Sequence, residues 1–315
     1  MDDNTYTIAF YNLENLFDTE YNHYTLDKDY TPNGNKKWTP SRYRKKLLKL
    51  GTTISKIGFM DTDGPPSILG VAEVENSKVI RDLLASESLK DFDYGFIHYD
   101  SPDERGIDTA LIYLRSDFEE IYSEPIPLLV NNLNGIRDTT RDILYVHGKL
   151  NGEEVHIFVN HWPSRREGGI ETAYKRIKAV QILTEHIKRI EEDKNDPKFI
   201  IMGDFNDGPT SESIVQLVQG TQFFNATSNL LTYTTGSAHH RNSWLLFDQI
   251  IISPNFLQNG PGTHEFLEAH LLDEHFLREW KGKYKGNPFR TYAGDKYLGG
   301  YSDHFPVYIK MRYNQ

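Results

Sequence analysis

The sequence contains no cysteine, which excludes disulfide bonds, thiolate metal ligands and a cysteine nucleophile. It has no apolar run near the roughly 20 residues that a membrane-spanning helix needs. Its first residues, MDDNTYTIAF, also lack the basic segment and apolar stretch of an export signal. The compartment stays open: the chain as written is expected in the cytoplasm, and a protein whose leader had been removed would lie outside it.

An excess of basic residues is missing as well. The chain has 35 Lys and Arg against 45 Asp and Glu, which gives a net charge of −10. Because proteins that coat nucleic acids need many Lys and Arg contacts to phosphates, this balance argues against a broad nucleic-acid-binding face. It still allows a small anionic substrate or a brief encounter with a nucleic acid. Basic residues cluster at 41–46, where we expect the solvated face of a helix, and at 164–166.

The glycine-rich loops of nucleotide-binding proteins are absent too. No G-x-G-x-x-G follows the first expected strand, and no G-x-x-x-x-G-K-[ST] occurs, so a doubly wound dinucleotide fold is disfavoured. No linker rich in Pro, Gly or Ser, no low-complexity tract and no repeat divides the 315 residues. We therefore expect a single domain over 1–315.

What the sequence does contain is a series of apolar, strand-like runs mixed with amphipathic segments of helical spacing. The strands are expected at 5–11, 67–74, 108–115, 198–202, 247–253 and 303–313, and the helices at 40–57, 76–86, 171–192 and 211–218. Asn151-Gly152 predicts a type I′ hairpin between strands at 143–150 and 153–162. Strands that are apolar on both faces, with a few helices to cover them, predict two packed sheets with the helices outside.

Five strand-like runs begin or end with carboxylate, carboxamide or imidazole side chains. The motifs are YNLEN at 11–15, AEVEN at 72–76, NHWPS at 160–164, GDFND at 203–207 and SDHFP at 302–306. Buried strands normally end in turn residues that suit the backbone geometry. The repeated Asp, Glu, Asn and His therefore predict one polar site, built from many strand ends, for hard-metal and phosphate chemistry.

GDFND is the sharpest of these motifs. Asp204 and Asn206 lie two residues apart after a buried strand, so both side chains can face one pocket, although an Asx turn would use the same residues. Asp303 and His304 open the last strand, either as a metal- and phosphate-binding pair or as a salt-bridged strand start. Asp248 precedes a strongly apolar run, and we expect it to hold His304 in one tautomer and to raise its pKa.

Two further residues stand out by their surroundings. Glu73 is an acid among apolar neighbours, which costs free energy unless it binds a metal or a partner, and Glu75 competes for the same role. His161 ends one arm of the hairpin, where an imidazole can transfer a proton, bind phosphate or be purely structural.

Taken together, the motifs resemble those of the endonuclease/exonuclease/phosphatase superfamily, the group related to deoxyribonuclease I. The resemblance covers almost the whole chain, with the matching residues in the family's order: Asn12, Glu73, His161, Asp204, Asn206, Asp248, Ser302, Asp303 and His304. It implies an α+β fold in the form of a four-layer α/β/β/α sandwich, in which two packed, mostly antiparallel sheets are flanked by helices.

The resemblance also implies in-line hydrolysis of a phosphate ester with Mg²⁺ or Mn²⁺. The residues implied as metal ligands are Glu73 as the main ligand, Asn12 and Asp303 in or near the metal shell, and Glu14 as a secondary ligand. Glu14 stands where several relatives have Asp, so its extra methylene would shift a second metal position.

The resemblance assigns the remaining residues to catalysis or to substrate binding. Asp204 would orient or deprotonate the attacking water, and Asn206 would help to hold the phosphate. His304, oriented by Asp248, would stabilise the developing charge. His161 would contact the phosphate or assist the leaving oxygen. The residues expected to bind substrate are Arg105, Asp108, Asn160, Arg290 and Tyr292.

The favoured function is a nuclease. The alternatives are a phosphatase or phospholipid phosphodiesterase of the same superfamily, and a protein that binds a phosphate-bearing ligand without cleaving it. The expected partner is a phosphate-ester substrate, with nucleic acid as one form, and no protein partner is implied. Cleavage direction, oligomeric state and the choice between Mg²⁺ and Mn²⁺ stay open.

Overall fold

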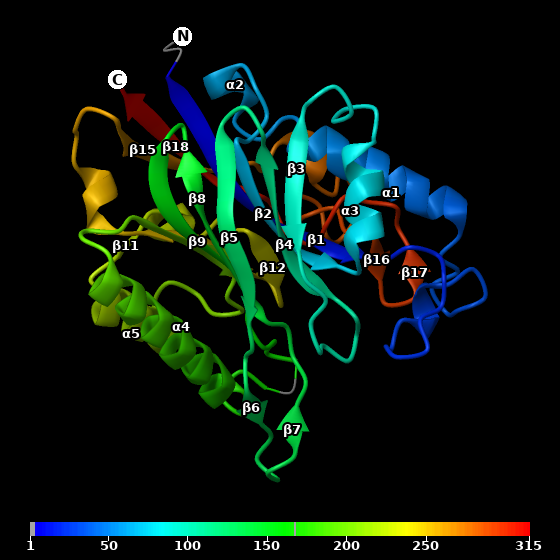
Figure 1. Ribbon diagram of the computed structural model, residues 1–315. Helices are drawn as coiled ribbons and strands as arrows, with labels where there is room; N and C mark the ends of the chain where they lie inside the picture. The colour runs from blue at the N-terminus through cyan, green and yellow to red at the C-terminus, as the bar shows by residue number, and fades with distance from the viewer. Residues whose placement is uncertain (1–3, 167) are drawn as a thin grey trace.

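Two six-stranded sheets form the centre of the computed structural model, which describes residues 4–166 and 168–315 (Figure 1). The strand order in the first sheet, sheet A, is β15 (Thr263–Leu271), β18 (Val307–Asn314), β1 (Thr5–Leu16), β2 (Ile68–Val74), β4 (Asp108–Leu114) and β3 (Tyr94–His98). The order in the second sheet, sheet B, is β11 (Phe224–Asn225), β14 (Asp248–Ile252), β10 (Phe199–Asp204), β9 (Glu153–His161), β8 (Ile143–Leu150) and β5 (Phe118–Ile126).

Helices and short strand pairs complete the fold. The α-helices are α1 (Pro40–Ile54), α2 (Phe59–Thr62), α3 (Ser77–Leu84), α4 (Ala173–Asp193) and α5 (Glu212–Thr221). The strand pairs are β6 (Val130–Asn131) with β7 (Arg137–Asp138), β12 (Ala238–His240) with β13 (Ser243–Leu245), and β16 (Tyr292–Ala293) with β17 (Lys296–Tyr297). Short 3-10 helices lie at Lys28–Tyr30, Ser228–Leu230, Pro254–Leu257 and His275–Leu277. Among the described residues, no helix combines the length and apolar character that crossing a membrane requires.

Three apolar layers hold the helices and sheets together. The middle layer lies between the sheets and contains side chains of both, such as Phe10 of sheet A and Val146 of sheet B. A second layer, which includes Leu50, joins α1 and α3 to the outer face of sheet A, and a third, which includes Leu183, joins α4 and α5 to sheet B. Figure 1 shows these two helix pairs on opposite sides of the molecule. The predicted four-layer sandwich is therefore confirmed.

Each sheet has one parallel strand pair near its centre and antiparallel pairs elsewhere. In sheet A the parallel pair is β1 with β2, and in sheet B it is β9 with β10. The next strand along, β18 beside β1 and β14 beside β10, is antiparallel. The carboxyl ends of two parallel strands share an edge with the amino end of an antiparallel neighbour. Each sheet thus delivers three strand ends, and the motifs they carry, to one edge.

The predictions that rest on turn and cap chemistry are confirmed. Asn151 and Gly152 have φ angles of 48° and 90° and join β8 to β9, as an Asn-Gly hairpin requires. Asn76 caps α3, because its side chain accepts hydrogen bonds from the backbone N–H groups of Lys78 and Val79.

Several predicted boundaries are wrong. The first strand runs to Leu16 instead of ending at residue 11. The first helix ends at Ile54 instead of residue 57, and the last strand begins at Val307 instead of residue 303. Pro306 directly precedes that strand, and a proline has no N–H for a sheet ladder. Asp303 and His304 therefore lie in the segment that leads into β18.

The basic cluster at 41–46 is not the purely solvated helix face that we expected. Arg44 and Lys45 are exposed, but Lys46 is only 2% exposed. Its Nζ donates hydrogen bonds to Thr291 Oγ1 at 2.6 Å and to the Tyr301 carbonyl at 2.5 Å. Through these two hydrogen bonds, the buried Lys46 holds α1 to the segment before β18.

Candidate active site

The predicted site residues of both sheets meet at the shared strand-end edge. Asn12 comes from β1, Glu73 from β2, His161 from β9 and Asp204 from β10. Asn12 Nδ2 donates a hydrogen bond to Asp204 Oδ2 at 3.0 Å. His161 Nε2 lies 4.0 Å from Glu73 Oε1 and 3.8 Å from Asp204 Oδ2. Residues that are far apart in the sequence thus form one cluster across the two sheets.

Asp204 is a buried carboxylate at the centre of the cluster. It pairs in register with Asp248 of β14 and is 2% exposed. Its Oδ1 accepts the backbone N–H of Asn206 at 2.9 Å, while its Oδ2 accepts the Asn12 amide. Burial raises the pKa of Asp204 to about 6, because the nearby His304 and these hydrogen bonds offset the lost hydration only in part.

Asp248 and His304 form the pair that the sequence predicted. The Nδ1 atom of His304 lies 2.6 Å from Asp248 Oδ2, and its Nε2 lies 3.9 Å from Asp204 Oδ2. Burial alone would lower the pKa of His304, but the Asp248 carboxylate outweighs it and holds this pKa well above the usual value. The predicted contact is confirmed, and the imidazole carries a proton that its Nδ1 donates to Asp248.

His161 has the opposite charge state. It is 3% exposed, and its Nδ1 has no hydrogen-bond partner among the residues that the structure describes. Burial, with the nearby guanidinium groups of Arg141 and Arg105, holds the pKa of His161 well below its usual value. The site therefore contains one neutral and one protonated imidazole, a division that suits acid–base chemistry.

Glu73, rather than Glu75, faces the cluster. Its Oε2 accepts the backbone N–H of Asn15 at 2.8 Å, and its Oε1 lies 3.7 Å from the Arg105 guanidinium. Glu75 instead accepts the backbone N–H of Asp18 at 2.6 Å. In a regular strand the two acids would share a face. A left-handed backbone at Glu73, with φ 64°, separates them.

The backbone at this edge is unusual at several positions. Four non-glycine residues have positive φ: Glu14 (51°), Asn15 (53°), Glu73 (64°) and Asn206 (50°). Residues with a Cβ rarely adopt this conformation. β1 and β2 also lose their regular register here. Strain of this kind costs of order 1–3 kcal/mol per residue and collects at functional sites, where the surrounding structure holds it.

Glu14, the predicted secondary metal ligand, is buried and held by the chain. Its carboxylate accepts the backbone N–H groups of Thr291 at 2.6 Å and Tyr292 at 3.3 Å, and lies 3.9 Å from Lys46 Nζ. Burial and the negative charge of Asp303 raise its pKa to about 7, although Lys46 opposes the shift. The carboxylate thus fastens the segment before β18 to the end of β1.

Asp303 and Arg290 lie on the open side of the cluster. Their side chains are 32% and 41% exposed, and the Arg290 guanidinium lies 3.6 Å from Asp303 Oδ2. Ser302 Oγ donates to the Asn12 carbonyl at 2.6 Å and ties this segment to β1. Tyr292, by contrast, is only 6% exposed, so the structure places it within the packed wall behind these residues.

Asp108 and Asn160 are near the same strand ends but already have partners. Asp108 accepts hydrogen bonds from Ser101 and lies 3.0 Å from His98 Nε2. Asn160 is fully buried, donates to two main-chain carbonyls and accepts the Trp162 indole N–H at 3.0 Å. Their polar groups are therefore engaged within the protein.

Sequence reasoning missed two residues that shape the site. Asn15 Oδ1 accepts a hydrogen bond from the Arg105 guanidinium at 2.5 Å. Arg141 is 6% exposed, donates to the Trp162 carbonyl at 2.8 Å and lies 3.1 Å from Asp103. Asn15 stands in the YNLEN motif and could have been found there. Nothing in the sequence around Arg141 distinguishes it.

The oxygen atoms of the cluster fit a hard divalent cation. Glu73 Oε1 accepts no hydrogen bond among the described residues, Asn12 Oδ1 accepts a single N–H, and Asp303 is partly exposed. Carboxylate and amide oxygens are the donors that Mg²⁺ prefers. Asp248 and His304 belong to another close group of possible ligands, yet the proton on His304 would block its coordination.

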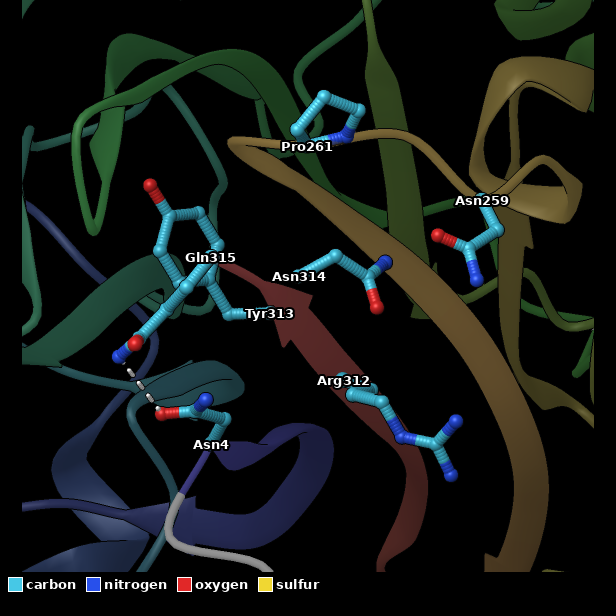
Figure 2. A pocket seen from close by; sticks show the side chains of 7 residues that line it. All are labelled: Asn4, Asn259, Pro261, Arg312, Tyr313, Asn314 and Gln315. Atoms are coloured by element: carbon cyan, nitrogen blue, oxygen red, sulfur yellow. Dashed lines mark hydrogen bonds between the residues drawn. The ribbon is translucent and has the colours of Figure 1, made fainter.

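A hollow lies at the opposite end of sheet A (Figure 2). Its volume is about 440 Å³, and it is lined by Asn4, Asn259, Pro261, Arg312, Tyr313, Asn314 and Gln315. Figure 2 shows mostly amide side chains there, and Gln315 donates to Asn4. These lining residues include no Asp, Glu or His side chain, so the chemically competent groups gather at the other ends of β1 and β18.

Comparison with known proteins gives a family and several folds. Solved structures similar to this chain include a mannosyl-6-phosphatase of Bacteroides thetaiotaomicron VPI-5482 (17% identity, TM-score 0.61, 98% of this chain and 100% of that one). A second is D. rerio TDP2 complexed with a single-strand DNA product (14% identity, TM-score 0.58, 98% of this chain and 100% of that one). A third is the human Nocturnin catalytic domain with a bound sulfate (16% identity, TM-score 0.57, 98% of this chain and 95% of that one).

Identities this low establish the fold alone, and no curated protein matches the sequence. The family model gives more, since it matches residues 7–313 of the chain. The protein therefore belongs to the Endonuclease/Exonuclease/phosphatase family, a superfamily of phosphoesterases.

Proposed function

We propose that this protein is a metal-dependent phosphoesterase that hydrolyses a phosphate ester by in-line attack of water. The observation that carries the proposal is the position of Asp204. Its Oδ2 accepts the Asn12 amide and lies 3.8 Å from His161 Nε2 and 3.9 Å from His304 Nε2. A proton acceptor, a neutral imidazole and a protonated imidazole thus converge where a phosphate would react.

Asp204 is the group that would orient and deprotonate the water. With a pKa of about 6 it is ionised at neutral pH and still accepts a proton readily. Asn12 fixes one of its oxygens and the Asn206 N–H fixes the other. The Asn206 side-chain amide donates to the Trp162 carbonyl at 3.0 Å, which leaves its second N–H for a phosphate oxygen.

The two histidines would act on the phosphate itself. His304 is protonated and aimed by Asp248, so it would place positive charge next to the phosphoryl oxygens as their charge develops. His161 is neutral and would donate to the phosphate or to the leaving oxygen. Asp248 keeps the His304 ring in one orientation and would not itself contact substrate.

Glu73, Asn12 and Asp303 are the residues that would hold Mg²⁺ or Mn²⁺, with Glu14 as a secondary ligand. When bound, the ion supplies positive charge that neutralises and polarises the phosphate. The Asn15 N–H holds the second oxygen of the Glu73 carboxylate, so Oε1 is the atom left for coordination.

A nucleic acid is the substrate that we propose first. The relative TDP2 was solved with a single-strand DNA product, which supports this choice. The mannosyl-6-phosphatase supports the alternative of a phosphatase, and a phospholipid phosphodiesterase is a further alternative. The net charge of −10 favours a short or exposed ester over a long duplex. A binding protein without catalysis is less favoured, because each matched position holds a competent residue.

The test is hydrolysis of plasmid DNA, RNA, inositol phosphates, sphingomyelin and bis(4-nitrophenyl) phosphate, each with Mg²⁺, Mn²⁺ or EDTA. Asp204→Asn is assayed in parallel, with Asp193→Asn, an exposed aspartate at the end of α4, as the matched control. The proposal predicts cleavage that needs metal, disappears in Asp204→Asn and persists in Asp193→Asn. Cleavage in EDTA, or a folded protein that binds metal and cleaves nothing, would overturn it.

A further inference from the structure

A small cavity lies beside the site, and none of the roles above uses it. Its volume is about 130 Å³, and three arginines line it: Arg105 before β4, Arg141 between β7 and β8, and Arg166 after β9. Thr140 and Ser164, which carry hydroxyl groups, also line it. We call this space the arginine cavity.

The arginine cavity shares its wall with the catalytic cluster. Arg105 lines the cavity and at the same time lies 3.7 Å from Glu73 Oε1. Arg141 donates to the carbonyl of Trp162, the residue after His161. Both guanidinium groups are close enough to His161 to lower its pKa. A ligand in the cavity would therefore sit next to a phosphate bound at the cluster.

Two buried groups on the cavity wall lack hydrogen-bond partners. Arg141 is 6% exposed, and its Nε has no partner among the described residues. Thr140 is 4% exposed, and its hydroxyl is also unpartnered among them. A buried donor without an acceptor costs free energy, so such groups are rare unless a water or ligand satisfies them. The lining of the cavity thus includes two residues with donors that still need an acceptor.

The charges on the wall favour an anion. Asp103, Glu104 and Asp138 also line the cavity, but Asp103 is paired with Arg141 at 3.1 Å and Asp138 lies 2.9 Å from Lys175, which leaves the charge of Glu104 against those of Arg105 and Arg166. Arg166 is exposed and makes no ion pair within residues 4–166 and 168–315. It remains available for a ligand.

The size of the cavity limits the ligand. A water molecule takes up about 30 Å³, so 130 Å³ holds a group of about four water volumes. A phosphate group fits this space. Arginine is the side chain that best matches phosphate, because its planar guanidinium donates two parallel hydrogen bonds.

We propose that the arginine cavity binds a second phosphate group of the substrate, next to the one that is cleaved. The inference rests on the proposed phosphoesterase function and narrows its substrate to esters that carry at least two phosphates. The second phosphate comes either from the neighbouring position of a nucleic acid strand or from a small bisphosphate.

The experiment compares substrates that differ only by a second phosphate. The nucleotide set is the dithymidine phosphodiester TpT against pTpT and TpTp, and the sugar pair is fructose 6-phosphate against fructose 1,6-bisphosphate. The readouts are kcat and KM for the wild type, Arg166→Gln and Arg165→Gln. Arg165 is the matched control, since it is exposed in the same loop but its guanidinium lies 3.7 Å from Asp207 instead.

The wild type is expected to favour the substrate with the second phosphate by about tenfold in KM, the usual scale for one charged hydrogen-bonding contact. Arg166→Gln should lose this preference while Arg165→Gln keeps it. A preference in the nucleotide set alone identifies a nucleic acid strand, and one in the sugar pair alone identifies a small bisphosphate. Absence of any preference, or equal behaviour of the two variants, would overturn the inference.

A binding measurement separates this inference from the proposed function. If no substrate is hydrolysed, the phosphoesterase proposal fails, but calorimetric titration of TpT and pTpT into the wild type and Arg166→Gln still tests the cavity. Tighter binding of pTpT that is lost in Arg166→Gln supports the arginine cavity. Equal binding of TpT and pTpT by the wild type would overturn it.

Discussion

The two sheets bring different chemistry to their shared edge. Sheet B contributes His161, Asp204 and Asp248, each at most 3% exposed. On the sheet A side, Asn12 is equally buried, but the side chains of Glu73 and Asp303 are 13% and 32% exposed. The enclosed groups of sheet B suit proton transfer and charge stabilisation, because charges interact strongly where water is excluded. The more open oxygens of sheet A suit a cation that exchanges with solvent.

The backbone differs in the same way. β9, β10 and β14 keep a regular register up to the pair of Asp204 and Asp248. β1 and β2 lose their register, and Asn15 and Glu73 have positive φ. His304 bridges the two sides, since it precedes β18 of sheet A but contacts Asp248 of sheet B. Regular strands hold the acid–base groups, whereas irregular backbone aims the oxygen donors.

The largest expected effect comes from the sheet B side. Asp204→Asn keeps the shape of the side chain but removes the proton acceptor, so kcat should fall by about 10³-fold, within the usual range for a general base. The measurement is single-turnover hydrolysis at saturating metal. A variant that keeps a near wild-type rate would show that Asp204 accepts no proton.

The bridging histidine should have the next largest effect. His304→Gln removes the protonated donor, and loss of such a preorganised group costs about 10²- to 10³-fold in kcat. The steady-state rate constants test this, with His240→Gln, an exposed histidine of β12, as the control. An unchanged kcat with a raised KM would contradict a role in the transition state.

Variants of Glu73 and Glu14 should distinguish a metal ligand from a carboxylate that mainly stabilises the fold. Glu73→Gln should raise the Mg²⁺ concentration for half-maximal rate by about tenfold or more, while the fold stays intact. Glu14→Gln should change this concentration less and lower the free energy of unfolding, since it weakens the buried contact with Lys46. The hydrolysis rate of each variant is measured over a range of Mg²⁺ concentrations, and the free energy of unfolding is measured with urea. Equal shifts in metal requirement would make Glu14 a full ligand.

The smallest effect concerns His156, at the other end of β9 from His161. Burial, with nearby His147, lowers the pKa of His156 from 6.5 to about 4. Between pH 6.5 and pH 4, His156 is protonated in the unfolded chain but neutral in the folded protein. The free energy of unfolding therefore decreases as pH falls from about 6.5 to about 4. Urea unfolding of the wild type and His156→Gln over this range should give a flatter pH dependence for the variant. Identical slopes would contradict the assignment.

The sheet B side of the site could largely be predicted from the sequence, because local sequence patterns determine where its residues lie. The Asn151-Gly152 turn fixes the register of the hairpin that delivers His161, and the buried run before Asp204 leads directly into its motif.

The sheet A side could not be predicted in the same detail. Strand periodicity puts Glu73 and Glu75 on one face, and only the left-handed backbone at Glu73 separates them. Lys46 lies in a basic run that is typical of a solvated helix, and its partner Thr291 is 245 residues away in the sequence. Local patterns give no indication of such a partner.

The most direct test of a single site shared by both sheets is a double-variant cycle. It measures kcat/KM for the wild type, Glu73→Gln, Asp204→Asn and the double variant at one metal concentration. If both edges act on one bound phosphate, the two losses are not additive, and the double variant is about as slow as Asp204→Asn alone. A double variant whose loss equals the product of the two single losses would contradict the shared site.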